Sequence, residues 1–357
     1  MLLVVNAGSS SIKLAVFDAD LRQVLAGSVT EIGAAGRLRL GAVARDVAAA
    51  DHQAALALCL QAMAAQGVAV ADLTAAAHRV VHGGAGLVAS CRVTPAVIDG
   101  IEACVPLAPL HNPANLTAIR ALAALMPDLA QYVSFDTAFH ATNPEVAVTY
   151  ALPLAERARG IRRYGFHGIS YAGLVRSVAD LAGGVPQRLL ALHLGNGASL
   201  CAIRDGVSVA TTMGYSPLDG ITMGTRCGGI DGNAVLRLAE LHGVAGAARI
   251  LNRESGLLGL GGSSDMRALQ ESDSAEAGFA RQHFCYWAVR HAGSMIAAMG
   301  GLDAIAFTGG IGENDAQVRD AIVAGLRWAG EVPVWVIAAE EERSIAAEAL
   351  ALQAQGL

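Results

Sequence analysis

Three glycine-rich turns, each following a predicted buried strand, carry residue types that bind phosphate. The first, at 6–11, reads Asn-Ala-Gly-Ser-Ser-Ser, and Lys13 lies in the next strand. Backbone N–H groups and hydroxyls in such a turn donate to phosphate oxygens, Gly8 allows close approach or a positive φ, and Lys13 adds a positive charge. A plain hairpin with a polar turn fits these residues equally well, so this turn alone leaves both interpretations open.

The second turn, at 195–199, reads Gly-Asn-Gly-Ala-Ser and repeats the surroundings of the first. A strand precedes it, and the strand that follows ends at Asp205, as the strand after the first turn ends at Asp18. This echo predicts two similar domains, each presenting a phosphate-facing turn to a shared cleft. The third turn, at 308–314, leads from a strand into a helix, which is the geometry of nucleotide binding.

Arg79 and Arg226 lie among glycines and small residues, which leaves their guanidinium groups available to a carboxylate or a phosphate. For either one alone, a structural bond to loop carbonyls is the simpler alternative. Asp136 follows a predicted strand, a position that faces a cleft or caps the next turn. His78 and His82 are four residues apart, but no acidic third ligand is near them in sequence, so we do not expect a zinc site.

Composition narrows the classes of protein that this chain can belong to. Its 357 residues, 54% of them apolar and 16% charged, suffice for two domains with well-covered sheets. A net charge of −6 argues against a nucleic-acid surface. Six scattered cysteines without a C-x-x-C motif indicate reduced thiols in a cytoplasmic protein. Neither a signal peptide nor a membrane span is expected.

Strands alternate with alanine-rich helices, a pattern that predicts an α/β protein with mixed or parallel sheets. Helices are predicted at 48–66, 113–125, 169–181, 233–241, 275–299, 316–328 and 341–355, and strands at 76–81, 131–135, 189–194, 304–307 and 333–337.

The chain resembles the acetate kinase family over nearly its whole length. The similar segments, in matching order and spacing, are 6–13, 78–84, 109–113, 135–140, 164–168, 193–199, 213–226, 255–261, 264–267 and 307–314. The resemblance implies two duplicated ribonuclease-H-like domains with mixed sheets flanking a nucleotide cleft, and a homodimer. Domain I, for the acyl substrate and phosphates, would comprise 1–138 and a returning helix at 342–357, and domain II, for the nucleotide, 139–341.

The resemblance also implies roles for the matched residues. Asp136 would be the active-site carboxylate, while His167 and Arg226 would stabilise the transferring phosphoryl group. Arg79 would bind the acetate carboxylate, and the methyl group would lie in a pocket of Val81, Leu110, Phe166 and Pro217. Mg²⁺, or Mn²⁺ in its place, would be bound near Asn6 and Glu341. ATP would be bound by Lys13, His193, Leu194, Gly195, Asn196, Gly197, Asp265, Met266, Arg267, Gly310, Ile311, Gly312, Glu313 and Asn314.

The implied reaction is reversible in-line transfer from ATP to acetate, giving acetyl phosphate and ADP. Acetate is already ionised at neutral pH, so no general base is needed, and we expect Asp136 to orient an arginine or the metal. A propionate or other short-chain acyl kinase is the nearest alternative. Val81 favours acetate, although one methylene contributes only about 1–3 kcal/mol of discrimination.

An alternative from another class is a catalytically weakened, ATP-dependent switch protein of the same superfamily. The joint presence of Arg79, His167 and Arg226 favours the enzyme. Departures from the family pattern exist, however: Cys227-Gly228-Gly229 replaces Ser-Gly-Asp, which removes a carboxylate near Arg226, and Gly232 replaces a proline. Positions 339–342 differ from the usual Thr-Asn-Glu-Glu, so the role of Glu341 rests on register alone. The segments at 33–46 and 328–333 are shortened.

Overall fold

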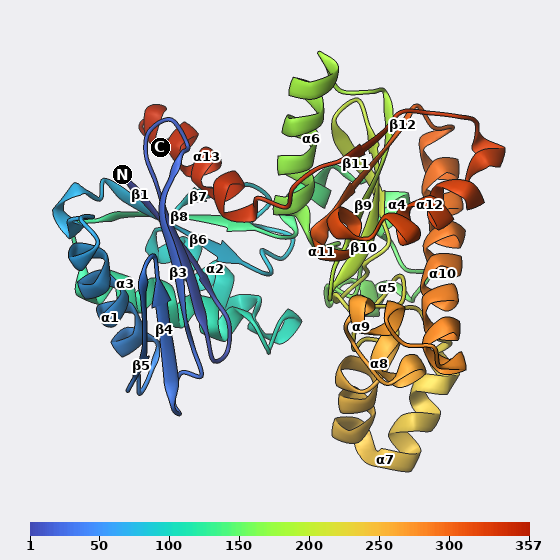
Figure 1. The fold of residues 1–357 in the computed structure, drawn as a ribbon, viewed down its shortest axis with the longest axis horizontal. Helices are drawn as coiled ribbons and strands as arrows, with labels where there is room; N and C mark the ends of the chain where they lie inside the picture. Colours follow the sequence, from blue (N-terminus) through green and yellow to red (C-terminus); the bar gives the residue numbers. More distant parts are fainter. The chain divides into compact units, whose positions relative to one another are not determined.

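The computed structural model describes all 357 residues, which divide into two compact units. Unit 1 consists of Met1–Ala138 and Glu340–Leu357, and unit 2 consists of Phe139–Ala339. In Figure 1 the returning C-terminal segment of unit 1 is the dark red helix beside blue and cyan strands. The chain returns at Glu340, two residues before the expected boundary, and Glu341 therefore lies in unit 1 rather than in the second domain.

Unit 1 contains an eight-stranded mixed sheet in the order β5-β4-β3-β2-β1-β6-β8-β7. The strands are β1 (Leu2–Ala7), β2 (Ile12–Phe17), β3 (Gln23–Thr30), β4 (Gly36–Leu40), β5 (Val43–Val47), β6 (Ala75–Val80), β7 (Cys91–Arg92) and β8 (Ala130–Phe135). The helices are α1 (His52–Ala65), α2 (Pro95–Ala103), α3 (Asn112–Leu125) and α13 (Glu341–Ala354), with 3₁₀ turns at Val70–Asp72 and Val105–Leu107.

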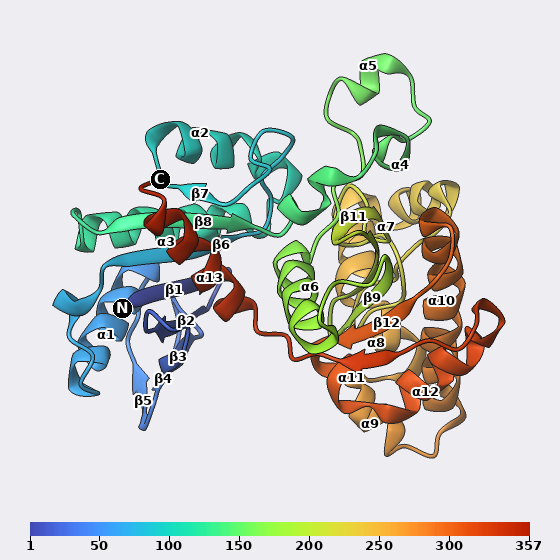
Figure 2. The same ribbon diagram turned by 90° about the horizontal axis from the view of Figure 1, so that it is seen from above.

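Side chains of the central strands alternate between two covered faces of this sheet. Leu3 and Val5 of β1 pack in one buried cluster with Leu56 and Met63 of α1. The opposite face is covered by α13, which contacts β1, β6 and β8 (Figure 2). Glu348 of α13 accepts hydrogen bonds from two serine hydroxyls of the unit, so this helix is held to the sheet by polar as well as apolar contacts.

Unit 2 contains a five-stranded mixed sheet in the order β11-β10-β9-β12-β13. The strands are β9 (Arg188–Leu194), β10 (Ala198–Arg204), β11 (Val207–Thr211), β12 (Ala304–Thr308) and β13 (Val334–Val336). The helices are α4 (Glu145–Val148), α5 (Leu154–Arg157), α6 (Gly168–Ala182), α7 (Gly232–Arg253), α8 (Gly256–Gly261), α9 (Met266–Gln270), α10 (Ala275–Met299), α11 (Gly309–Asn314) and α12 (Ala316–Gly325), with 3₁₀ turns at Ala138–Thr142, where the two units join, and Arg327–Ala329.

The sheet of unit 2 also has helices on both faces, as Figure 1 shows for α6 and α10. Tyr171 and Leu174 of α6 pack in a buried cluster with Leu189 and Ala191 of β9. On the other side, α10 contacts β9, β10 and β11. The two helices therefore bury a sheet whose β9, β10 and β12 residues are almost entirely inaccessible to solvent.

The two sheets share one strand topology. In unit 1, β3, β2 and β1 form an antiparallel meander, and β6 and β8 continue the sheet in parallel. In unit 2, β11, β10 and β9 form the meander, and β12 and β13 continue in parallel. This repetition confirms the prediction of a mixed α/β fold with duplicated ribonuclease-H-like domains, which was drawn from the echo between the first two glycine turns and the family resemblance.

Candidate active site

The strand register of unit 1 places polar residues side by side on the face covered by α13. Asn6 of β1 pairs with Lys13 of β2, and Arg79 of β6 pairs with Ser134 of β8. Because β1 and β6 are parallel with Val5 opposite His78, Asn6 is level with Arg79. The row lies near the carboxyl ends of the parallel strands, which is where sheets of this kind bind ligands.

Arg79 and Asp136 form a two-pronged ion pair at this row. Arg79 Nε donates to Asp136 Oδ1 at 3.0 Å, and Nη2 donates to Oδ2 at 2.6 Å. The remaining nitrogen, Nη1, lies 3.5 Å from Asn6 Oδ1. The Asp136 side chain is 3% exposed and that of Arg79 23%, so the carboxylate is buried while the cation keeps access to solvent. Asp136 thus fixes the plane of the guanidinium, and Nη1 makes only the long hydrogen bond to Asn6.

Glu341, in the first turn of α13, adds negative charge near the same pair. Burial raises the pKa of the Glu341 carboxyl, Arg79 opposes this rise, and the charges of Asp136 and Glu342 add to it. Burial alone would lower the pKa of Arg79, but the charges of Asp136 and Glu341 outweigh it and raise the value. Several carboxylates therefore surround one arginine, an arrangement that a further cation would stabilise.

The opening turn of unit 1 is a tight hairpin whose backbone is largely satisfied internally. Gly8 N donates to Ser11 O at 2.8 Å, and Gly8 O is 2.7 Å from His52 Nε2. A Cβ on Gly8 would lie 3.1 Å from Ser11 Oγ, and the residue has no positive φ, so close approach rather than left-handed backbone explains the glycine. Lys13 is exposed beyond this turn.

The residues expected to surround a methyl group are divided between the units. Val81 is buried in unit 1, where its backbone N–H donates to Asn115 Oδ1 at 3.1 Å, whereas Leu110 is 56% exposed. Phe166 and Pro217 belong to unit 2, and the Phe166 ring is buried.

In unit 2, His167 and Arg226 converge on Gly197. A Cβ on Gly197 would lie 3.2 Å from both His167 Nε2 and Arg226 Nη2, so the absent side chain leaves room between two nitrogen donors. Arg226 is held in place by Pro217, whose carbonyl accepts from Nη1 at 2.6 Å. Burial lowers the pKa of the Arg226 guanidinium. Two donors on one glycine turn can bind an oxyanion from two directions.

His167 has a backbone conformation that is uncommon for a residue other than glycine. It lies at φ +58° immediately before α6, in the left-handed region that costs a non-glycine residue free energy. Its ring stacks on His193 with 4.0 Å between ring centroids, and His193 Nδ1 is hydrogen-bonded to Ser170 Oγ at 2.9 Å. The surrounding side chains therefore determine the orientation of His167.

A hollow of about 460 Å³ in unit 2 brings together two distant segments expected to bind adenosine. The predicted residues that line it are Gly195, Asn196, Asp265, Met266, Arg267, Gly310, Ile311 and Asn314. Ser264, Gln270 and Asp315 also line it, and none of these was predicted. Gln270 Nε2 donates to Asp315 Oδ2, and Asp315 caps α12 by accepting from Val318 N. These two hydrogen bonds connect α9 to the start of α12 beside the hollow.

The remaining residues expected to bind ATP lie outside the lining of this hollow. The Leu194 side chain is fully buried in β9, and a Cβ on Gly312 would contact Phe307 and Leu194. Glu313 Oε1 accepts from the backbone N–H groups of Gly309 and Ala339, which makes it a support for the loop. Leu194 and Gly312 are therefore packing positions, and the Glu313 side chain supports the third glycine turn.

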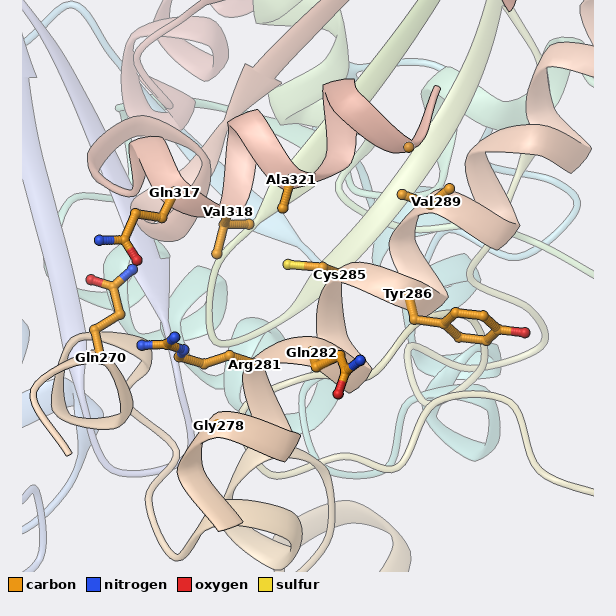
Figure 3. Close-up of a pocket in the computed structure, with 11 residues that line it drawn as sticks. Gln270, Gly278, Arg281, Gln282, Cys285, Tyr286, Val289, Gln317, Val318 and Ala321 are labelled. Carbon is orange, nitrogen blue, oxygen red and sulfur yellow. The ribbon is translucent and has the colours of Figure 1, made fainter. Parts of the chain in front are cut away.

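Two other hollows lie in unit 2, away from Gly197. One, of about 540 Å³, is bounded by α10 and α12 and contains Arg281, Cys285 and Val318 (Figure 3). The other, of about 410 Å³, is lined by Cys227 and Gly229 of the segment that departs from the family pattern, and by His283 and Trp287 of α10. Neither contains the residues predicted to be catalytic.

Sequence reasoning missed Ser199 and Tyr171, which contact the candidate catalytic histidine. Ser199 Oγ lies 2.9 Å from His167 Nδ1 and 2.6 Å from the Tyr171 hydroxyl. The available signal was spacing: Tyr171 follows His167 by four residues, one helical turn, and Ser199 closes the second glycine turn.

Fold and site together define a protein of two ribonuclease-H-like domains, one with an arginine–carboxylate pair and one with a nucleotide-sized hollow beside a glycine turn. The chain belongs to the acetokinase family, whose model matches residues 1–346. It is 43% identical to an acetate kinase of Streptomyces coelicolor over 347 residues, which cover 92% of this chain and 85% of that protein.

Solved structures agree with this assignment. The crystal structure of Porphyromonas gingivalis acetate kinase matches with a TM-score of 0.94 at 32% identity, covering 99% of both chains. A propionate kinase from Francisella tularensis matches almost equally well, with a TM-score of 0.93 at 32% identity, covering 97% of this chain and 98% of that one.

Proposed function

We propose that the protein transfers the γ-phosphoryl group of ATP to acetate, reversibly forming acetyl phosphate and ADP. The observation that carries this proposal is the Arg79–Asp136 pair, because an oriented guanidinium whose third nitrogen makes only a 3.5 Å hydrogen bond, to Asn6, suits a small carboxylate. Family membership and the acetate kinases among the relatives support the same reaction.

In this reaction the acceptor needs orientation rather than activation. Acetate is ionised at neutral pH, and its oxygen can attack phosphorus without losing a proton. Arg79 would bind the carboxylate through Nη1 while Asp136 holds Nε and Nη2. Asp136 would therefore act through Arg79 and would not remove a proton during turnover.

The nucleotide would be bound by unit 2. The 460 Å³ hollow between α9 and α11 would accept adenosine, and the backbone N–H groups of the glycine turns would face the phosphates. During in-line transfer, charge develops on the equatorial oxygens of the γ-phosphoryl group, and His167 and Arg226 would stabilise it beside Gly197. Lys13 of unit 1 would add a mobile positive charge for the phosphates.

A magnesium ion fits the donor chemistry of unit 1. Asn6 offers an amide oxygen, and Glu341 is a carboxylate whose pKa is raised by burial and by neighbouring acids, so a cation there would offset crowded negative charge. The structure contains no cluster of three or more His, Cys, Asp or Glu side chains arranged for a metal. An Mg²⁺ ion at Asn6 and Glu341 would therefore need waters and phosphate oxygens as its other ligands. When bound, Mg²⁺ would neutralise phosphate charge, and Mn²⁺ would replace it.

A homodimer in the cytoplasm completes the proposal. Exposed apolar side chains on α7 and α10, among them Leu236, Val244 and Phe279, supply surface for a partner copy. All six cysteines are free, which suits a reducing compartment. None of the helices has the length and apolar character needed to cross a bilayer.

Propionate is the second candidate acceptor, because a propionate kinase shares the fold as closely as an acetate kinase does. The experiment is a hydroxamate assay with ATP, Mg²⁺ and acetate, propionate or butyrate in parallel. Acetate is expected to give the highest kcat/KM, with propionate within about 10–200-fold, since one methylene carries limited discrimination. Absence of acyl phosphate from all three acids would refute the proposed function.

A further inference from the structure

The imidazole of His167 is linked to two buried hydroxyl groups on the α6 face of the sheet. Its Nδ1 lies 2.9 Å from Ser199 Oγ, and Ser199 Oγ lies 2.6 Å from the Tyr171 hydroxyl. Both Ser199 and Tyr171 are fully inaccessible to solvent. Each polar hydrogen in this row of three hydrogen-bonded side chains must therefore have its acceptor inside the protein.

The Tyr171 hydroxyl determines which atom donates in each of these two hydrogen bonds. Its hydroxyl carries one hydrogen, and burial raises its pKa well above the ordinary value, so that hydrogen is retained. The hydroxyl also has a hydrogen bond with the backbone of His193, but that bond lowers the pKa of Tyr171 and is therefore donated by the His193 N–H, so Ser199 Oγ is the acceptor in contact with Tyr171. Tyr171 therefore donates to Ser199, because the reverse direction would bury the tyrosine hydrogen without an acceptor.

Ser199 then has one hydrogen of its own and one remaining contact, His167 Nδ1. If Nδ1 carried a hydrogen and donated to Ser199, the serine would accept twice and its own hydrogen would be buried unpaired. If Nδ1 is unprotonated, it accepts from Ser199, and both hydroxyl hydrogens then have an acceptor. Only the second arrangement leaves no orphaned hydrogen.

We propose that Tyr171 and Ser199 fix His167 as a neutral imidazole whose single hydrogen is on Nε2. Nε2 is the atom that faces Gly197 beside Arg226 Nη2. His167 is thus a neutral donor paired with a cationic one, rather than a second cation. Tyr171 and Ser199 are positioning residues, since they act through the ring and do not reach the space at Gly197.

The other groups around the ring are compatible with a neutral imidazole. His193 stacks on it from β9, at 4.0 Å between centroids, and its own Nδ1 is hydrogen-bonded to Ser170. Arg226 approaches from the loop before α7, and its positive charge opposes protonation of His167. Two adjacent imidazolium rings beside a guanidinium would repel one another, whereas a neutral His167 avoids this.

The direct test is nitrogen NMR of the intact protein with labelled histidine at neutral pH, the His167 signals being assigned by their loss in His167→Asn. We expect Nδ1 to have the shift of an unprotonated ring nitrogen and Nε2 that of a protonated one. A protonated Nδ1 in the unmodified protein would overturn the proposal. This measurement needs no substrate, so its outcome is independent of whether acetate is the acceptor.

A kinetic test uses Ser199→Ala and Tyr171→Phe. Because the tautomer would no longer be fixed, we expect kcat to fall by about 10–100-fold for Ser199→Ala, with KM values for ATP and acetate within about twofold. Tyr171→Phe should have a smaller effect, and Ser199→Thr, which keeps the hydroxyl, should restore most of kcat.

The matched control is Tyr164→Phe, which removes a buried hydroxyl that donates to Gly160 O in the same unit. Its kcat should match that of the unmodified protein. Equal losses of kcat in Tyr164→Phe and Tyr171→Phe, or Ser199→Ala with an unchanged kcat and an unprotonated Nδ1, would reduce the hydroxyl chain to a packing role and overturn the proposal.

Discussion

Arg79 and Asp136 are joined by two parallel hydrogen bonds, from Nε to Oδ1 at 3.0 Å and from Nη2 to Oδ2 at 2.6 Å. The two residues lie on adjacent parallel strands, one residue beyond the end of β8 in the case of Asp136. This geometry commits the carboxylate to the arginine, so the role we propose for Asp136 is to orient Arg79 rather than to remove a proton.

Asp136→Asn tests whether Asp136 acts by orienting Arg79. The amide cannot accept two charge-assisted bonds, so the guanidinium loses its fixed plane and the partly exposed cation loses its buried counter-charge. We expect kcat/KM for acetate to fall by about 100-fold or more, equivalent to about 3 kcal/mol. Because no proton is removed, the residual rate should keep the pH dependence of the unmodified protein. Near-normal turnover in the variant would contradict the role of Asp136.

Arg226→Ala removes the cationic partner at Gly197. Because the charge it meets develops in the transition state, kcat should fall by about 10³-fold while KM for ATP and acetate changes little. Arg226→Lys should recover only part of the rate, since a point charge does not reproduce the fork anchored on Pro217 O. A variant with weakened substrate affinity and intact kcat would place Arg226 in ground-state binding instead.

Gly197→Ala tests the space between His167 and Arg226. The added Cβ would lie 3.2 Å from a nitrogen of each, so both donors must shift by a few tenths of an ångström. We expect a loss in kcat of about 10–100-fold with little change in thermal stability, since Gly197 has no positive φ. Gly232→Ala, where a Cβ meets nothing within 4 Å, is the control and should keep full activity.

The acid stability of the protein should depend on His78. Burial lowers its pKa to about 4, against a partly compensating hydrogen bond to Gln131. Between pH 6.5 and 4 the unfolded chain binds a proton that the folded chain does not, so the free energy of unfolding falls as pH falls, by about 1.4 kcal/mol per pH unit for this group. Urea unfolding at several pH values should show this slope, and His78→Asn should have a shallower one. An equal slope in both proteins would contradict the assignment.

Much of the fold could be predicted from the sequence because its strong signals are local. Buried strands next to glycine turns marked the first two strands of both sheets, and α10 covers Ala275–Met299 as predicted. The β3–β5 meander was not predicted, because β3 and β5 lack a strict alternation of buried and exposed residues and β4, which has one, is only five residues long. Gly243, at φ +70° and ψ 165°, is non-helical and divides α7 (Gly232–Arg253) into two helices, and the predicted helix at 233–241 matches the first of them.

The sequence identified most residues of the candidate site, but it did not predict which of them contact one another. Sequence order cannot show that Asp136 and Arg79 meet, because their contact depends on the parallel register of β6 and β8. The same holds for Ser199, which reaches His167 only because α6 covers β10. Motifs name the groups that do chemistry, whereas the residues that orient those groups are placed by register and helix packing.

The most direct test of the central claim uses acetate labelled with ¹⁸O in its carboxyl group, incubated with ATP, Mg²⁺ and the protein. Because a carboxylate oxygen attacks the γ-phosphorus, we expect acetyl phosphate whose bridging oxygen carries the label, observed as an isotope shift in ³¹P NMR. Failure to form acetyl phosphate, or a product with an unlabelled bridge, would contradict it.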